Sequence, residues 1–468
     1  RKEIEQALSQ IQTLQKAVNA KPSGAAAPPA AAELQQQISN ERTSIESLEK
    51  RLDQLAADPQ PIASTETSAK RSFESGHGAE TTPGITSGLA PADIYKGGFF
   101  VETADKSFSV YMNGLFQTRF TWFKPGSSVA RLGESPESTS NFDVYLGRLA
   151  FSGSAFSPTL KYFIQMQGST VGNGNGITLL DWFTAKTFSK GLTLQVGRFW
   201  TPFTYEYYDS PANYLFADLS TAEFAFVLPR AIGFEAYGQE GKLSYAGVIA
   251  NSIPALDAPG QENFNNRMSY IGNLHFDILA PYGYVETDPS KNAAPKPELT
   301  LWGSVAYNPI AGSSGLENVA AGDKTTDATA TAGFRYTRFT LQTTGYFRRT
   351  NPLNLPNNDS WGYGEQAGFY LVPSRFEVAE RVSGVNWGGI QFPPLAPVSS
   401  SSLAVSNGWY AGPTFPYHNI TEHSVGLNYY LFGHNAKLQL SYSYLTGNTF
   451  SHSKFNANRI WVQTQIMY

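Results

Sequence analysis

The most regular feature of the chain is an alternation of apolar and polar side chains that begins near Gly97 and continues to the C-terminus. In 160–169 and 436–445, apolar residues occupy every second position, and most residues between them are Lys, Gln or Ser. Because successive side chains of a β-strand point to opposite faces, these segments predict strands with one apolar and one polar face. The polar faces are too uniform for the core of a soluble β-sandwich. We therefore expect the apolar faces to contact lipid and the polar faces to contact water.

Sixteen segments carry this strand pattern. They are 108–123, 142–156, 160–169, 178–188, 192–200, 231–239, 242–251, 266–278, 299–308, 328–336, 339–349, 361–372, 375–385, 422–432, 436–446 and 457–468. Turns such as Glu240-Gly241 are tight, whereas 124–141, 201–230 and 386–421 are long. Short turns at one rim and long loops at the other are typical of an outer-membrane barrel. The segment 279–298 is long where a short turn is due, which leaves the strand count open by two.

The first 96 residues have a different pattern. Apolar residues at alternating steps of four and three, with Glu41 at the one polar position, form a heptad seam: Leu34, Ile38, Ile45, Leu48, Leu52 and Leu55. A weaker seam precedes it, and an Ala/Pro stretch at 21–32 separates the two. We predict a periplasmic coiled coil over 1–56, a flexible linker over 57–96 and an outer-membrane barrel over 97–468. The alternative for 33–56 is one amphipathic helix lying on the barrel.

Composition fits a barrel better than a soluble domain or a helical membrane protein. Charged residues make up 15% of the chain, against about a quarter in a typical soluble domain, and aromatic residues make up 14%. No apolar run approaches the roughly 18 residues that a membrane-spanning helix needs. The fold class is therefore predicted as an all-β membrane protein, a 16-stranded antiparallel transmembrane β-barrel with an N-terminal α-helical coiled coil. The net charge of −4 gives no reason to expect a nucleic-acid partner.

Several short segments occur in order along the predicted barrel. They include Leu146-Gly147-Arg148-Leu149, Val196-Gly197-Arg198-Phe199-Trp200, Arg230-Ala231-Ile232-Gly233, Gln366-Ala367-Gly368-Phe369-Tyr370, Arg375-Phe376-Glu377 and Lys437-Leu438-Gln439-Leu440. With these segments, nearly all of 108–468 resembles the phosphate-selective porin O/P family. The resemblance implies sixteen-stranded trimers whose third extracellular loop folds into the lumen and narrows it. The predicted loop 201–230 follows the fifth strand and holds that position.

The N-terminal seam is similar to that of the DcaP-like trimeric porins of the same superfamily, which favour small dicarboxylates. This resemblance implies a homotrimer, although Ile at a and Leu at d lean by themselves towards two strands. It also implies the outer membrane of a Gram-negative cell as the location, with lipid and lipopolysaccharide around the barrel. The N-terminal segment would then lie in the periplasm, where it could reach peptidoglycan.

The polar strand faces carry an excess of basic residues. Following the alternation, the pore-lining candidates are Arg119, Arg148, Lys161, Arg335, Arg348, Arg381 and Arg459, against Asp181, Glu235 and Glu377. Guanidinium groups suit carboxylate and phosphate geometry, so this excess predicts an anion preference. The alternative is that these side chains pair across neighbouring strands, or along one strand as Glu377 could with Arg381.

The loop 201–230 adds charges of the opposite sign. Its constriction candidates are Glu206, Asp209, Asp218, Glu223 and, at its end, Arg230, together with Tyr205, Tyr207, Tyr208 and Tyr214. The carboxylates could face the wall arginines across the pore or point into the wall. The tyrosines could stack on sugars or pack the loop against the wall. The loop contains no lysine, unlike the Lys-rich constriction that phosphate-specific porins are expected to carry.

Residues for catalysis are not grouped in the sequence. The chain has no cysteine, its six histidines are scattered, and the Gly-rich stretch 172–176 has no helix after it. We therefore expect no enzyme activity, no metal and no cofactor. The predicted function is passive diffusion of small hydrophilic solutes through an outer-membrane porin, with small anionic solutes such as carboxylates or phosphate preferred. The alternatives are a structural barrel that tethers the envelope through its coiled coil, and a soluble secreted carbohydrate-binding protein.

Overall fold

The structure is a computed structural model in which most of 99–468 can be described. The described residues are 99–126, 138–170, 177–251, 253, 267–289, 296–309, 323–352, 356–388, 417–449 and 454–468. The predicted coiled coil over 1–56 and the linker over 57–96 lie outside them, so both stay predictions. In the described part, no helix is both long and apolar enough to cross a membrane.

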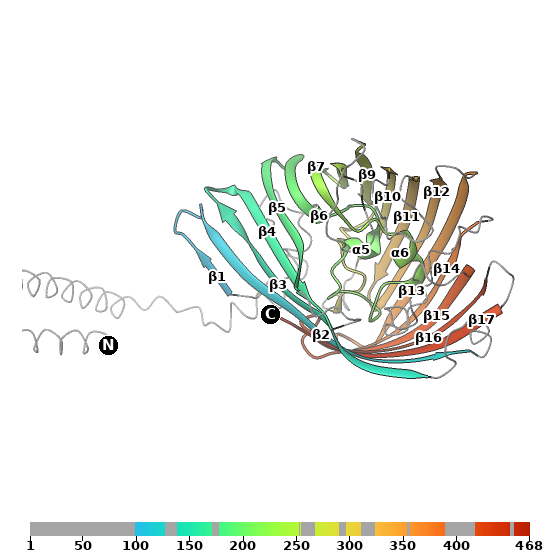
Figure 1. The fold of residues 1–468 in the computed structure, drawn as a ribbon. Coiled ribbons are helices and arrows are strands. Elements are labelled where there is room, and N and C mark those ends of the chain that lie inside the picture. The colour runs from blue at the N-terminus through green and yellow to red at the C-terminus, as the bar shows by residue number, and fades with distance from the viewer. Residues whose placement is uncertain are drawn as a thin grey trace, which may run out of the picture. The chain divides into compact units, whose positions relative to one another are not determined.

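Sixteen long antiparallel strands close into a barrel (Figure 1). They are β2 (Ser109–Pro125), β3 (Thr139–Ala155), β4 (Ser157–Gly168), β5 (Ile177–Ser189), β6 (Leu192–Trp200), β7 (Arg230–Glu240), β8 (Leu243–Ala250), β9 (Ser269–Asp277), β10 (Glu298–Pro309), β11 (Lys324–Tyr336), β12 (Phe339–Asn351), β13 (Asn358–Val372), β14 (Phe376–Asn386), β15 (Tyr417–Tyr430), β16 (Ala436–Thr449) and β17 (Lys454–Met467). Each strand pairs with its neighbours in sequence, and β17 pairs with β2 to close the ring. The sixteen-stranded antiparallel barrel is thereby confirmed, with every strand close to its predicted position.

One short strand was not predicted. β1 (Phe99–Glu102) pairs with the start of β2, from Phe99 opposite Met112 to Glu102 opposite Ser109. β17 pairs with β2 only as far as Leu115, so β1 takes up the pairing of β2 where β17 ends. Four residues are too few for a reliable alternation, which explains why the pattern did not reveal this strand.

The barrel carries its apolar side chains outside and its polar side chains inside. Outward residues such as Val196 and Val305 are 56% and 63% exposed, whereas the inward Gln439 and Gln463 are fully buried. Exposed aromatic residues stand near both rims: Tyr270, Tyr307 and Trp361 at one end and Tyr336, Phe339, Phe369 and Tyr429 at the other. This distribution is the inverse of that in a soluble protein. Together with the two aromatic girdles, it is what a barrel surrounded by lipid requires.

Two connections fill the inside of the ring. The first joins β6 to β7 and contains the short helices α5 (Tyr205–Tyr208) and α6 (Thr221–Phe226), which lie within the ring of strands in Figure 1. We call residues 201–229 the inner loop. The second is the long connection after β9, whose residues 278–289 we call the strap. We call the rim with the short turns the turn rim and the opposite rim the loop rim. The strap starts at the turn rim, and the inner loop starts at the loop rim.

The unusual length of 279–298 therefore has a structural reason. It does not change the number of strands, which stays at sixteen. Instead, the described part of this connection turns inward, and Tyr282, Glu286 and Thr287 are fully buried.

Candidate functional site: a filled lumen

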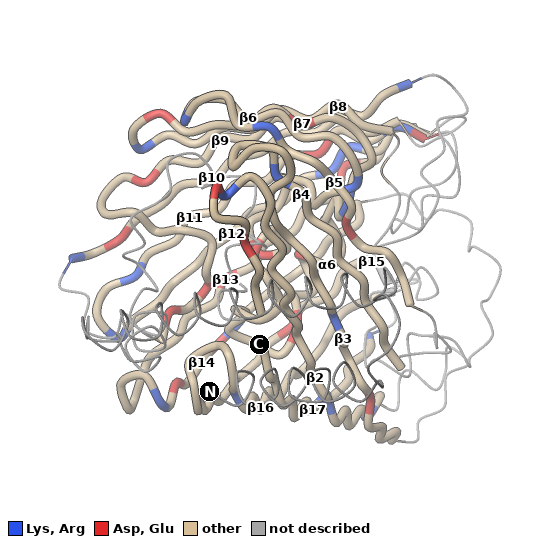
Figure 2. Tube along the Cα trace, turned by 90° about the vertical axis from the view of Figure 1, so that its left-hand side faces the viewer, with Lys and Arg blue, Asp and Glu red and all other residues tan. Residues whose placement is uncertain are grey.

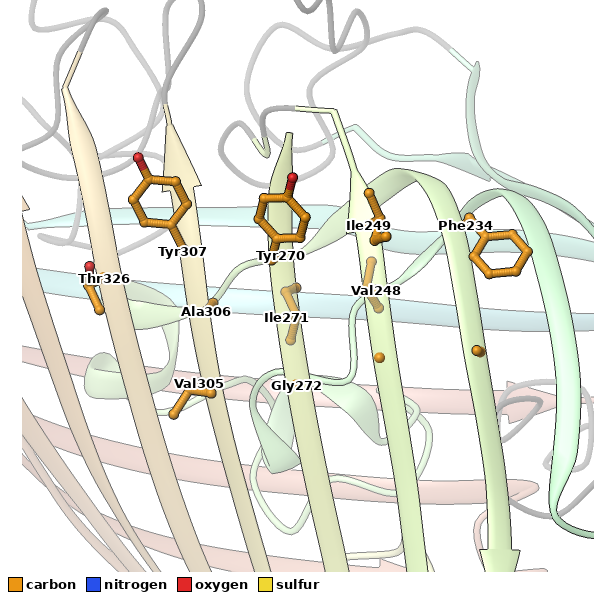
Figure 3. A pocket seen from close by; sticks show the side chains of 12 residues that line it. Phe234, Val248, Ile249, Tyr270, Ile271, Gly272, Val305, Ala306, Tyr307 and Thr326 are labelled. Carbon is orange, nitrogen blue, oxygen red and sulfur yellow. The ribbon is translucent and has the colours of Figure 1, made fainter. Parts of the chain in front are cut away.

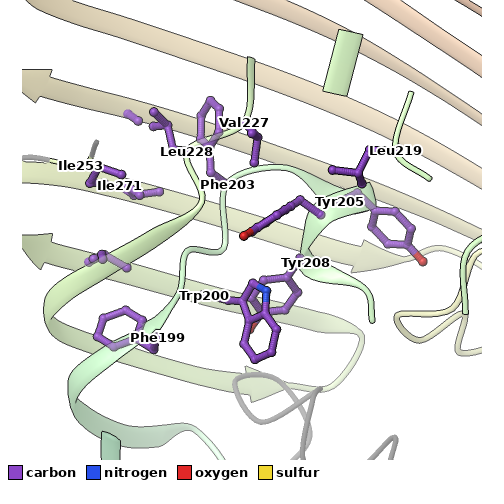
Figure 4. Packing of buried hydrophobic residues seen from close by; sticks show 14 of the residues in the cluster. Phe199, Trp200, Phe203, Tyr205, Tyr208, Leu219, Val227, Leu228, Ile253 and Ile271 are labelled. Atoms are coloured by element: carbon purple, nitrogen blue, oxygen red, sulfur yellow. The ribbon is translucent and has the colours of Figure 1, made fainter. Parts of the chain in front are cut away.

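The two ends of the inner loop meet beside the barrel wall. The backbone N–H of Thr201 donates to the carbonyl oxygen of Pro229 at 2.9 Å. Phe203, Val227 and Leu228 gather at this junction in Figure 4 and belong to a larger buried apolar cluster. Because both ends of the loop are fixed at one place, the residues between them are directed across the lumen.

Basic side chains of the wall hold the inner loop. Arg119 on β2 donates from Nη1 to the carboxylate of Asp218 at 2.6 Å. Arg381 on β14 forms an ion pair with Glu206 at 3.1 Å and donates to the carbonyl oxygen of Asp218 at 2.8 Å. Arg348 on β12 donates to the carbonyl oxygens of two residues of α6, Ala225 and Phe226, at 3.1 and 3.0 Å. These guanidinium groups therefore fix the loop to three strands of the wall, β2, β12 and β14.

Two further basic candidates are engaged mainly with the wall, whereas Arg335 on β11 pairs with Glu298 and also donates to the strap. Arg459 on β17 pairs with Glu422 on β15 at 3.0 Å, and Arg230 pairs with Asp181 on β5 at 2.9 Å. Lys161 on β4 is half-buried. The alternation placed these side chains on the correct face of their strands, but the expectation that they point into water does not hold. All except Lys161 are buried, because the inner loop and the strap occupy the space in front of them.

The suggested pair of Glu377 and Arg381 does not form. Glu377 accepts hydrogen bonds from Thr287, Asn428 and Tyr430 instead. Two residues four positions apart on one strand are separated by about 13 Å, which is too far for direct contact. Arg381 is thus left for the inner loop.

The tyrosines of the inner loop pack and do not present an aromatic surface to the lumen. Tyr205, Tyr207, Tyr208 and Tyr214 are all buried. Tyr205 and Tyr208 on α5 contact the ring of Trp302 on β10, with centroids 5.8 and 5.4 Å apart. Tyr207 accepts a hydrogen bond from Arg230 at 2.8 Å. Of the two readings of these residues, the structure supports packing against the wall.

The strap adds contacts that the sequence did not suggest. Its Glu286 backbone N–H donates to the carboxylate of Asp209 at 3.0 Å, and its side chain accepts from the backbone N–H of Leu215 at 2.7 Å. Lys437 on β16, also missed, donates to the carbonyl oxygen of Tyr214 at 2.9 Å. The length of 279–298 was the signal for the strap, and the polar face of 436–446 was the signal for Lys437.

Charge is distributed so that the inserted segments complement the wall. Basic and acidic positions are interleaved along the strands in Figure 2. Among the described strand residues, eight buried Arg or Lys side chains stand against six buried Asp or Glu side chains. The inner loop and the strap bring five further buried carboxyl groups: Glu206, Asp209, Asp218, Glu223 and Glu286. The basic excess of the wall is therefore offset by acidic residues that enter from the two rims.

Burial shifts the titration of these loop carboxyl groups. It raises the pKa of Asp209 to about 7 despite hydrogen bonds from Asn213 and two backbone N–H groups. It raises the pKa of Glu223 to about 8, with a further upward contribution from the charge of Glu206. Both effects arise because a buried site disfavours the charged carboxylate. The packed loop consequently favours protonated carboxyl groups.

We expect the inner loop to pack less tightly as the pH rises. A carboxyl group whose pKa is raised in the packed state stabilises that state. The stabilisation is fully present at pH values below the ordinary pKa of 4.5, and it is lost as the pH rises to about 8. Thermal melting in detergent between pH 4.5 and 9 should therefore show a falling melting temperature, and Glu223→Gln should reduce this slope. Glu102→Gln, which changes an exposed carboxyl group on β1, is the control. Equal slopes for both variants would contradict the assignment.

The outer surface has a groove of its own. An apolar hollow of about 560 Å³ crosses β7 to β11 and is lined by Phe234, Ile249, Tyr270, Val305 and Tyr307, among others (Figure 3). Its exposed side chains are outward residues of the strands, so it belongs to the surface expected to contact lipid and not to the lumen. The described residues also contain no group of three or more His, Asp or Glu side chains placed to hold a metal ion.

Comparison with known proteins finds likeness in structure only. No family model and no curated protein matches the chain. The outer membrane channel DcaP of Acinetobacter baumannii matches over 79% of this chain and 99% of its own, with a TM-score of 0.50 and 8% identity. OmpT of Vibrio cholerae matches over 79% and 100%, with a TM-score of 0.49 and 10% identity. OmpF of Salmonella typhi matches over 78% and 100%, with a TM-score of 0.48 and 11% identity.

None of these three is described as phosphate-selective, so the resemblance to the porin O/P family stays a prediction. At 8% identity, the match to DcaP is informative about the arrangement of the strands. The chain has the barrel fold of an outer-membrane channel.

Proposed function

We propose that this protein is an outer-membrane porin through which small hydrophilic solutes diffuse passively. The observation that carries the proposal is a closed sixteen-stranded barrel with an apolar outside, a polar inside and a long loop inserted into its lumen. Such a wall can cross a bilayer because all its backbone groups pair between strands. Transport would be downhill and would need no cofactor. That the chain is not an enzyme remains a prediction.

We further propose the orientation and assembly of the barrel. Outer-membrane barrels have short turns on the periplasmic side, so the turn rim would face the periplasm and the loop rim the exterior. The similarity of the heptad seam in 34–55 to that of the DcaP-like trimeric porins suggests a homotrimer with its N-terminal segments in the periplasm, within reach of peptidoglycan. Lipid and lipopolysaccharide would cover the outward faces.

An anion preference, with small carboxylates or phosphate as solutes, is the finer part of the proposal. Most wall arginines are neutralised by carboxylates, so the preference would depend on charges with spare hydrogen-bonding capacity. Arg148 on β3 is such a residue: its Nε donates to Gln167 at 2.8 Å, and its Nη1 has no hydrogen-bond partner. Glu235 on β7 is the acidic counterpart of Arg148, because the Oε1 atom of Glu235 also has no hydrogen-bond partner.

The test is planar-bilayer conductance of the purified protein under a salt gradient. We expect channels whose reversal potential indicates anion preference, because no described carboxylate pairs with Arg148 and its positive charge adds to the field of the lumen. Arg148→Gln should move this potential towards cation preference. Cation preference in the unmodified protein would overturn the anion assignment and leave the porin intact.

A second function is favoured by the filled lumen. If the inner loop and the strap never leave, the barrel is closed, and its role would be to tether the envelope through its N-terminal segment. No conductance at any pH would support this reading. Deletion of 1–90 separates the two, because a porin keeps its conductance and a tether loses its effect on the envelope. Extraction without detergent would favour instead the soluble carbohydrate-binding alternative, against which the exposed apolar belt argues.

A further inference from the structure

We propose that the strap is a gate, which closes the barrel from the turn rim by docking against the inner loop. This inference rests on the proposed channel function. It concerns a segment that enters the lumen from the end opposite to the inner loop, so that the two close the lumen together.

The strap links two strands that lie four places apart in the ring of sixteen, β10 and β14. At one side, Tyr284 contacts Trp302 on β10, with ring centroids 5.8 Å apart. At the other side, Thr287 donates to Glu377 on β14 at 2.6 Å, and its carbonyl oxygen accepts from Nε2 of His434 in the turn after β15 at 2.7 Å. Between these anchors, Glu286 of the strap meets Asp209 and Leu215 of the inner loop, so the two segments together narrow the path through the lumen.

The contacts of the strap are of a kind that can be made and broken. Among the described residues, the strand-like pairing of the strap is limited to one isolated β-bridge between Ala280 and Glu298. Its firmest attachment is Arg335 on β11, which donates to the carbonyl oxygens of Tyr282 and Val285 and lies 3.8 Å from the ring centre of Tyr282. Beyond its first residues, which donate to the carbonyl oxygen of Leu299 on β10, the strap is thus held by one guanidinium group, by single hydrogen bonds from side chains and backbone N–H groups, and by aromatic packing. The strands of the barrel, in contrast, are held by continuous ladders.

The contact between strap and inner loop brings together two acidic residues. Glu286 and Asp209 meet through the hydrogen bond from the Glu286 backbone N–H, and both side chains are buried. The charged and titratable side chains that face Glu286 are Glu206, Asp209, Tyr205 and Tyr214 of the inner loop, Tyr282 of the strap, and Arg381 and Lys437 of the wall. Burial and two neighbouring carboxyl groups, Glu206 and Asp209, make ionisation of Glu286 unfavourable while the strap is docked, and the two basic groups offset this only in part.

Ionisation should therefore release the strap. Burial and the charges of Glu206 and Asp209 raise the pKa of Glu286 well above its ordinary value. The protonated form stabilises the docked strap at acidic pH, and this stabilisation is lost as the pH rises. The gate would be closed in acid and would open at higher pH.

The experiment uses the absence of cysteine from the chain. Thr287→Cys places one thiol on the buried part of the strap, where a water-soluble maleimide reaches it only after the strap has left the lumen. Arg335→Leu in this background should raise the labelling rate by about tenfold or more, because two hydrogen bonds from a charged donor are lost. It should also raise single-channel conductance. Arg349→Leu is the matched control, since Arg349 forms an exposed pair with Asp359.

A second variant guards against misfolding of the first, because Arg335 also pairs with Glu298 in the wall. Glu286→Gln keeps the acceptor for Leu215 and removes the ionisation, so it should slow labelling and keep conductance low at high pH. The proposal is overturned if labelling of Thr287→Cys is equally fast in all backgrounds and independent of pH. A barrel that never conducts, yet shows these labelling changes, would refute the porin function and leave the movement of the strap established.

Discussion

Replacement of Arg381 with leucine is expected to lower the free energy of unfolding of the barrel by about 3–5 kcal/mol. The guanidinium group forms an ion pair with Glu206, donates to the carbonyl oxygen of Asp218 and donates to Gln366 on the neighbouring strand. Burial raises the pKa of Glu206, and the nearby Arg381 opposes this shift. Without Arg381, the Glu206 carboxylate is left buried with its cation removed, which is the costly way to break a buried pair.

Denaturant unfolding in detergent, followed by tryptophan fluorescence, measures this loss. The control is Arg349→Leu, which removes the same side chain from an ion pair whose members are 50% and 48% exposed. An exposed pair contributes about 0–1 kcal/mol, so this variant should resemble the unmodified protein. If both variants lose the same stability, Arg381 does not anchor the inner loop. The Arg381 variant should also show larger and noisier conductance, because the loop that it holds narrows the lumen.

Substitution of Gly197 with alanine is expected to prevent most of the protein from reaching its folded, heat-modifiable form. Gly197 lies in β6 with a φ of +136°, a backbone conformation that costs a residue with a side chain about 1–3 kcal/mol. A Cβ atom here would lie 2.7 Å from the Cα atom of Phe183 on β5 and still nearer to the carbonyl oxygen of Trp182. Both obstacles are backbone atoms of a paired strand, so they cannot move without breaking the ladder.

The folded fraction is read from the mobility of unheated samples on a gel. Gly303→Ala on β10 is the matched control, because a Cβ atom there meets nothing within 4 Å. This control should fold as well as the unmodified protein. A Gly197 variant that folds equally well would mean that the irregular backbone of β6 is not required for the barrel.

The sequence reveals much about the wall and little about what fills it. The positions of Arg119 and Arg381 in the alternation of their strands predict the face on which each side chain lies, and the structure agrees. Their partners were not predictable, since Asp218 lies 99 residues from Arg119 and Glu206 lies 175 residues from Arg381. The length of 279–298 marked the strap as unusual, yet nothing in its residues indicated that Glu286 meets Asp209.

The sequence by itself determined that the wall is built of long antiparallel strands, where each of them lies approximately, and which side chains face inward. These properties follow from a period of two in the backbone, which is local and repeats along the chain. Only the tertiary structure decided that the inward arginines are buried and neutralised and that the lumen is entered from both rims. Such contacts depend on the closure of β17 against β2 and on the path of two long connections. The alternation of side chains along a single strand contains no information about either of these.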